Sequence, residues 1–205
     1  MIVKFDHISY SCACFEEEKV RQMFAGYEAQ FHEVDLVNMS MKYKYMHKVQ
    51  EKHNIMLITK TENWPVEITA YESCEKKKDS FDKYVLKEDL IEIYSEYPEK
   101  TEEVLLLLGM KKSEEGVWEL KPLLDDRKLR IQVIKAQNAR KVYLDEEGYG
   151  SLAFVVDNAK KQREQFINSG YECSEIEELS VNGKILKIFF TNSPTNEIIE
   201  FIGLR

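Results

Sequence analysis

The stretch 150–203 constrains the fold most, because it predicts a strand, a helix and then further strands in close succession. An apolar run at 151–156 predicts the first strand, bounded by a glycine and by Asp157. Asp157 and Asn158 are residue types that cap the N-terminus of a helix. The helix is predicted over residues 159–169, and Gly170 is the residue type that favours a left-handed helix stop.

The remainder of this stretch predicts three strands after the helix. Runs at 171–179 and 184–191 are joined by Asn182-Gly183, a strong signal for a tight hairpin. A turn of Ser, Pro, Thr and Asn at 193–196 precedes the closing strand at 197–202. The stretch therefore predicts one βαβββ module.

The N-terminal part of the chain predicts the same succession of elements. A strand at 3–12 precedes a helix expected at 15–30, whose apolar stripe contains Val20, Met23, Phe24 and Tyr27. Strands are expected at 31–38, 54–60 and 66–71. Residues 39–53, rich in Lys, Tyr and Met, receive no assignment.

A third copy of the pattern lies in the middle of the chain. A strand at 90–95 leads to Pro98, which suits the first turn of a helix, and the helix ends before Gly109. Short strands are expected at 111–114, 117–123 and 129–135. The order of elements indicates an internal repeat. We therefore predict an α+β protein with modules at 1–80 (including a linker at 73–80), 81–147 (degenerate, with a connector) and 148–205.

Composition excludes several classes of partner. The chain has 205 residues and a formal net charge of −8, which argues against nucleic acid as a partner. No apolar run approaches the roughly 20 residues that a membrane span needs, and the first residues have no signal-peptide core. The four cysteines lack the second pair that a zinc set requires. We expect a soluble, cytoplasmic protein that binds a small molecule.

Several short motifs, together with the order of elements, resemble a known family. They are Asp6-His7-Ile8 on the first strand, residues 65–68 on the fourth, and residues 193–194 and 198–201 near the C-terminus. The chain resembles the vicinal oxygen chelate superfamily of glyoxalases, bleomycin-resistance proteins and extradiol dioxygenases. The resemblance implies curved half-barrel sheets with helices outside. It also implies either a metal-dependent lyase, isomerase or dioxygenase, or a ligand-binding or resistance protein without metal and without catalysis.

The family holds its metal through a side chain on the first strand, often His, and a Glu on the fourth strand of each module. The corresponding first-strand positions are His7, Leu90 and Ser151, and the fourth-strand positions are Glu67, Gln132 and Glu200. The first module alone keeps both ligand types. The resemblance thus implies that His7 and Glu67 bind a divalent metal such as Zn, Fe, Mn or Ni. The alternative is that they line a ligand pocket or bond to each other.

Alternation along the strands indicates which side chains face the cavity. Phe5, His7, Ser9 and Ser11 are expected on one face of the first strand. Ser151 and Glu200 are expected to face the cavity of the third module, and Glu67, Thr69 and Tyr71 that of the first. No residue is identified as catalytic. The expected ligand-binding residues are Ser9, Thr69, Gln132, Ser151 and Glu200.

Three modules leave one without a partner, since a half-barrel takes two. Consecutive modules usually lie side by side, so the second and third are expected to pair within the chain. The first would then pair with its own copy in a homodimer, and two His7 and two Glu67 would surround one metal. The competing arrangement pairs the first module with the third, and places His7, Glu67, Ser151 and Glu200 around one cavity.

Overall fold

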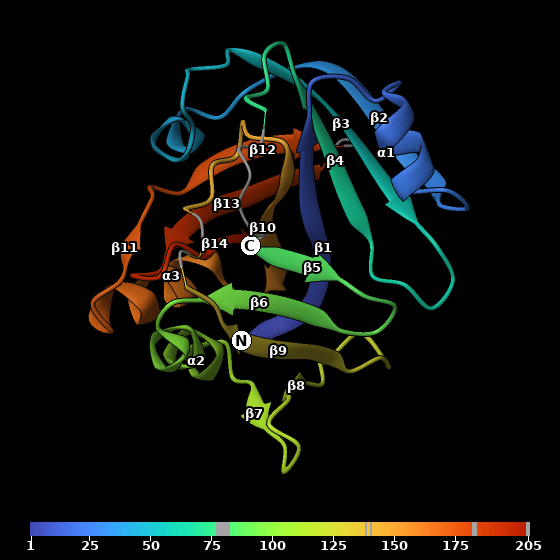
Figure 1. The fold of residues 1–205 in the computed structure, drawn as a ribbon. Helices are drawn as coiled ribbons and strands as arrows, with labels where there is room; N and C mark the ends of the chain where they lie inside the picture. Colours follow the sequence, from blue (N-terminus) through green and yellow to red (C-terminus); the bar gives the residue numbers. More distant parts are fainter. Residues whose placement is uncertain (77–82, 138, 140, 182–183, 204–205) are drawn as a thin grey trace.

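The first and third modules share one continuous curved sheet in the computed structural model, which describes residues 1–76, 83–137, 139, 141–181 and 184–203 (Figure 1). The strand order is β11-β13-β14-β10-β1-β4-β3-β2, with β12 paired to β13. The strands are β1 (Ile2–Cys12), β2 (Glu28–Val37), β3 (Lys52–Thr59), β4 (Val66–Tyr71), β10 (Gly148–Val156), β11 (Glu172–Cys173), β12 (Glu177–Val181), β13 (Lys184–Asn192) and β14 (Ile198–Gly203).

The two modules join through their first strands, which run antiparallel, with Ile8 opposite Leu152. On its other side each first strand pairs in parallel with the fourth strand of its own module, β1 with β4 and β10 with β14. The expected pairing of the second and third modules is therefore wrong. β1 and β10 are long strands, and each has one edge that its own module does not use. Pairing these two edges forms a longer ladder than the shorter strands of the middle module, such as β6, could form.

The middle module forms a smaller, separate sheet of order β5-β6-β9-β8-β7, drawn in green to olive in Figure 1. Its helix α2 (Pro98–Leu107) begins at the proline, as the sequence predicts. The order β6-β9-β8-β7 repeats the order β1-β4-β3-β2 of the first module, so the internal repeat is confirmed. The strands are β5 (Tyr84–Leu86), β6 (Ile91–Ser95), β7 (Lys111–Lys112), β8 (Trp118–Leu120) and β9 (Leu129–Lys135).

Helix α3 (Ala159–Asn168) follows the predicted rules at both ends. The side chain of Asn158 accepts a hydrogen bond from the backbone N–H of Lys161 (2.9 Å), and Gly170 has a φ of 85°. The ring of Phe166 packs on Phe201 of β14 at 5.0 Å between centroids. The helix therefore covers the outer face of its sheet, and the predicted α+β fold of curved sheets with helices outside is confirmed.

Helix α1 (Glu18–Met23) is much shorter than the predicted helix at 15–30. Val20 and Phe24 are buried as expected, but Met23 is 46% exposed. Gly26 adopts a φ of 82°, a left-handed conformation that an α-helix does not continue through. The chain then enters β2 at Glu28, a few residues before the predicted strand.

The unassigned residues 39–53 contain a 3₁₀-helix, η1 (Ser40–Tyr45), and the first residues of β3. We refer to residues 38–50 as the η1 segment; it crosses from the first module toward β12 and β13 of the third (Figure 1). The carboxylate of Glu177 accepts hydrogen bonds from the Ser40 hydroxyl and the Met41 N–H, at 2.5 and 2.9 Å. The buried carboxylate of Asp145 accepts two more from the backbone N–H groups of His47 and Lys48.

Two predicted connections fall at least partly outside the described residues: the Asn182-Gly183 turn and residues 77–80 of the linker at 73–80. The strands that flank the turn are paired, with Val181 opposite Lys184. Within the described part of the chain, no helix has the length and apolar character that a membrane crossing requires.

Candidate functional site

His7 lies between two carboxylates that come from different modules. Its Nε2 atom is 3.8 Å from Oε1 of Glu67 on β4 and 3.8 Å from Oε2 of Glu200 on β14. The register explains this convergence, because Glu67 is opposite Ser9 and Glu200 is opposite Ala153 in the two parallel pairs. Each glutamate thus sits next to its own first strand, and the β1–β10 ladder brings both to one imidazole.

A β-bulge positions the other nitrogen of the His7 ring. Phe5 is opposite Phe154 and His7 is opposite Ala153, so Asp6 is the extra residue of the bulge. The Nδ1–H of His7 donates a hydrogen bond to Oδ2 of Asp6 (3.0 Å). This bond fixes the orientation of the ring and directs Nε2 toward the glutamates.

The same bulge corrects the predicted orientation of Phe5. Simple alternation places Phe5 on the cavity face with His7, but its ring packs on Trp64 and Phe154 at centroid distances of 5.2 and 5.3 Å. Phe154 in turn contacts Phe201, which lies under α3. An extra residue in a strand reverses the alternation locally, and no sequence pattern marked its position.

The electrostatics of the cluster favour the charged forms of His7 and Asp6 and the neutral form of Glu200. Burial alone would lower the pKa of His7, but the carboxylates of Glu67, Asp6 and Glu200 outweigh it and raise the pKa to about 9. Burial would raise the pKa of Asp6, yet the hydrogen bond and charge of His7, with Lys4, lower it to about 2. Burial raises the pKa of Glu200, against the opposing charges of Lys42 and His7.

A small cavity of about 10 Å³ borders this cluster. Lys42 of η1 lines it together with Glu67 and Glu200, and the Lys42 side chain is buried with its Nζ 5.6 Å from the centre of the Phe190 ring. Thr69 and Tyr71 of β4 also line it, on the side that strand alternation predicts. A cavity of this size has room for about one water molecule or one ion.

The two serines among the predicted ligand-binding residues are hydrogen-bonded to each other. The hydroxyl groups of Ser9 and Ser151 are 2.8 Å apart, and the backbone N–H of Ser151 donates to the Ser9 hydroxyl at 2.7 Å. Both residues line the cavity, so the structure brings them to the site. Their mutual bonds tie the two modules together across the β1–β10 ladder.

Gln132 is the predicted site residue that the structure does not bring to the cavity. It lies on β9 of the smaller sheet, opposite Glu92 of β6, and is not among the residues that line the cavity. Ser9, Thr69, Ser151, Glu67 and Glu200 line it, and His7 lies beside the two glutamates, in the arrangement that pairs the first and third modules. Sequence reasoning missed Lys42, which lies in the unassigned segment, and it gave no role to Asp6.

The donor types at this site fit a divalent metal, although the side chains need to move. The Nε2 atom of His7 is buried and has no hydrogen-bond partner, and two carboxylate oxygens face it. An Asp on the opposite ring nitrogen is a frequent companion of a metal-bound His. Donors about 2.1 Å from a tetrahedral ion are roughly 3.4 Å apart, so the 3.8 Å separations must close slightly. As the side chains stand, no group of three His, Cys, Asp or Glu in the described ranges could hold a metal.

Similarity to known proteins is found among solved structures. No family model matches the chain, and no curated protein matches it. Among solved structures it is similar to a methylmalonyl-CoA epimerase, with 13% identity and a TM-score of 0.44 over 100% of this chain and 97% of that one. It is also similar to glyoxalase I from Zea mays, with 12% identity and a TM-score of 0.40 over 99% of this chain and 68% of that one.

A hypothetical protein from Bacillus halodurans gives 10% identity and a TM-score of 0.44 over 98% of this chain and 94% of that one. Because these TM-scores are below 0.5, the assignment of the fold rests on the strand order and register of this chain.

Proposed function

We propose that this chain binds a small molecule, as proteins of the glyoxalase and bleomycin-resistance type do, and holds one divalent metal through His7, Glu67 and Glu200. The observation that carries the proposal is the buried Nε2 atom of His7, which has no hydrogen-bond partner and faces both carboxylates at 3.8 Å. A bound Zn, Fe, Mn or Ni ion would supply Lewis acidity to an oxygen atom of the ligand. The resemblance implies three reaction classes, namely lyase, isomerase and dioxygenase.

The chain's own residues orient the site and restrict access to it. Asp6 holds the imidazole of His7, and Thr69 and Tyr71 line the cavity. A ligand larger than a water molecule needs more room than about 10 Å³, so the η1 segment must move to admit it. Glu177 and Asp145 accept hydrogen bonds from that segment, and its Met41, Tyr45 and Met46 side chains are buried. Opening the site therefore requires these apolar side chains to leave the core, as in a lid that opens.

A second candidate function is ligand binding or sequestration without metal. It is favoured by Lys42, whose buried ammonium group lines the same cavity as Glu67 and Glu200. A lysine in that place supplies positive charge to both carboxylates and can take the place of a metal ion. In this case the polar cavity binds its ligand through hydrogen bonds, and no metal is needed.

Calorimetric titration of the chelator-treated protein with Zn²⁺ and Mn²⁺ separates the two candidates. Under the first, the wild type binds one ion per chain and His7→Ala loses it, while His32→Ala, a histidine outside the site, keeps it. Under the second, the wild type binds no ion. Lys42→Met then gains affinity for the metal ion, because the competing charge of the lysine is gone. Absence of binding in both the wild type and Lys42→Met would rule out a metal site at these residues.

Two further properties remain proposals. A homodimer was expected because one module lacks a partner; in this fold the module without one is the middle module, 81–147. Light scattering tests it, and the mass of a single chain would contradict it. A cytoplasmic location rests on the sequence and is tested by cell fractionation.

A further inference from the structure

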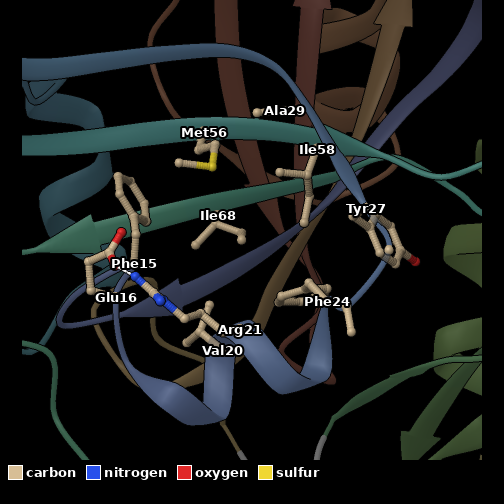
Figure 2. A pocket seen from close by; sticks show the side chains of 12 residues that line it. Phe15, Glu16, Val20, Arg21, Phe24, Tyr27, Ala29, Met56, Ile58 and Ile68 are labelled. Carbon is tan, nitrogen blue, oxygen red and sulfur yellow. Dashed lines mark ion pairs between the residues drawn. The ribbon is translucent and has the colours of Figure 1, made fainter.

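A second pocket, of about 390 Å³, lies on the outer face of the first module between α1 and the sheet (Figure 2). Ile58 and Ile68, on β3 and β4, form its floor, and Val20 and Phe24 of the α1 region form the opposite wall. Because neighbouring residues of a strand point to opposite faces, Ile68 faces this pocket while Glu67 faces the cavity beside His7. The pocket is therefore separate from that site, and the inference does not depend on the proposed function.

The pocket exists because α1 is too short to cover its sheet. α1 has 6 residues, whereas α2 and α3 have 10 residues each. The longer helices pack their apolar side chains on the sheets beneath them. The space left open is bounded at its ends by Phe15 and Tyr27. Phe15 is fixed by edge-to-face contact with His32 (5.1 Å), so the apolar walls are already formed. Volume and lining are those of a site for a small organic molecule.

The rim of the pocket carries a replaceable ion pair. Arg21 and Glu16 are paired at the mouth, and their side chains are 63% and 69% exposed (Figure 2). Exposed pairs of this kind contribute little to stability, so another carboxylate can take the place of Glu16 at low cost. Lys60, whose Nζ is 5.9 Å from the centre of the Tyr27 ring, lies near the other end of the pocket but does not line it. Arg21 is the cation among the described residues that line the pocket, and it can pair with an anion once Glu16 is displaced.

We propose that this pocket binds a small apolar anion, an alkyl or aryl carboxylate, with its hydrocarbon part on Ile58 and Ile68 and its carboxylate on Arg21. The apolar part is recognised by burial on the sheet, and the charge by the guanidinium group in place of Glu16. A neutral molecule of the same length is stabilised by burial of its apolar part alone and gains nothing from the charge of Arg21. Selectivity for the carboxylate over the alcohol is therefore the signature of the site.

Calorimetric titration with octanoate, and with octanol as the neutral counterpart, tests the proposal on the full-length protein. Octanoate is expected to bind with one site per chain and octanol at least fivefold more weakly. Arg21→Gln should weaken octanoate at least fivefold, and Glu16→Gln should strengthen it because the competing carboxylate is gone. Lys128→Gln, which removes one partner of an exposed pair with Glu119 elsewhere, should leave the affinity unchanged.

Three results would overturn the proposal. One is the absence of octanoate binding to the wild type. Another is equal affinity in the wild type and Arg21→Gln. The third is loss of binding in Glu200→Gln, which would place the ligand in the cavity on the other face. Ala29→Trp, at an exposed position on the pocket wall, provides a second variant and should block the pocket without removing a core residue.

Discussion

Nε2 of His7 lies 3.8 Å from Oε2 of Glu200, although the two residues are at opposite ends of the chain. This proximity exists because β1 and β10 pair edge to edge and carry β4 and β14 with them. One imidazole therefore faces carboxylates from two modules. The proposed metal would therefore be held by residues of one chain rather than shared across a dimer.

The charge of His7 makes the stability of the metal-free protein depend on pH. Its folded pKa of about 9 lies above the ordinary value of 6.5, so its contribution is complete below pH 6.5 and is lost as the pH rises through 9. We expect the free energy of unfolding to fall by about 3 kcal/mol across this window. Urea unfolding in the presence of a chelator measures it, and an identical pH dependence in His7→Gln would contradict the assignment.

The buried ion pair between Lys83 and Glu197 joins the middle module to the third. Its atoms are 2.5 Å apart and its side chains 1% and 2% exposed, and the Thr101 hydroxyl also donates to Glu197. Lys83→Ala leaves a buried carboxylate without its cation, so we expect a loss of about 3–5 kcal/mol in unfolding free energy. Denaturant unfolding measures the loss.

The exposed pair of Lys128 and Glu119 provides the matched control. Its side chains are 57% and 32% exposed, and Lys128→Ala is expected to change the unfolding free energy by less than about 1 kcal/mol. If the Lys83 variant is no less stable than this control, the ion pair does not hold the modules together.

Gly203 permits close packing of β14 on α3. A Cβ at this position would lie 2.6 Å from the Cβ of Ala159, the first residue of the helix. Gly203→Ala should therefore push α3 away from the sheet and reduce the unfolding free energy by about 1–3 kcal/mol. Thermal unfolding checks this, with Ala159→Gly in the same chain expected to restore part of the loss; no restoration would mean that the clash lies elsewhere.

Much of the fold could be predicted because its signals are local. Asn158, Pro98 and Gly170 act at the ends of helices where the sequence places them, and the order of elements in each module follows from such signals. The pairing of β1 with β10 depends instead on strand edges far apart in the chain, and adjacency in sequence favoured another partner.

The site was predictable in part for the same reason. Alternation placed Glu67 and Glu200 toward a cavity, but the bulge at Asp6 and the approach of Lys42 have no local signature. The η1 segment is irregular and takes its conformation from the surface on which it packs. Distant contacts of this kind decide what surrounds His7.

The ligands of the bound metal test the account most directly. X-ray absorption spectroscopy of the protein loaded with Zn²⁺ counts the imidazole and oxygen donors around each ion. The pairing of the first and third modules predicts one imidazole, from His7, with the remaining donors being oxygen atoms of Glu67, Glu200 and solvent. Two imidazoles per ion, as in a dimer that shares His7, or no stoichiometric zinc at all, would contradict the account.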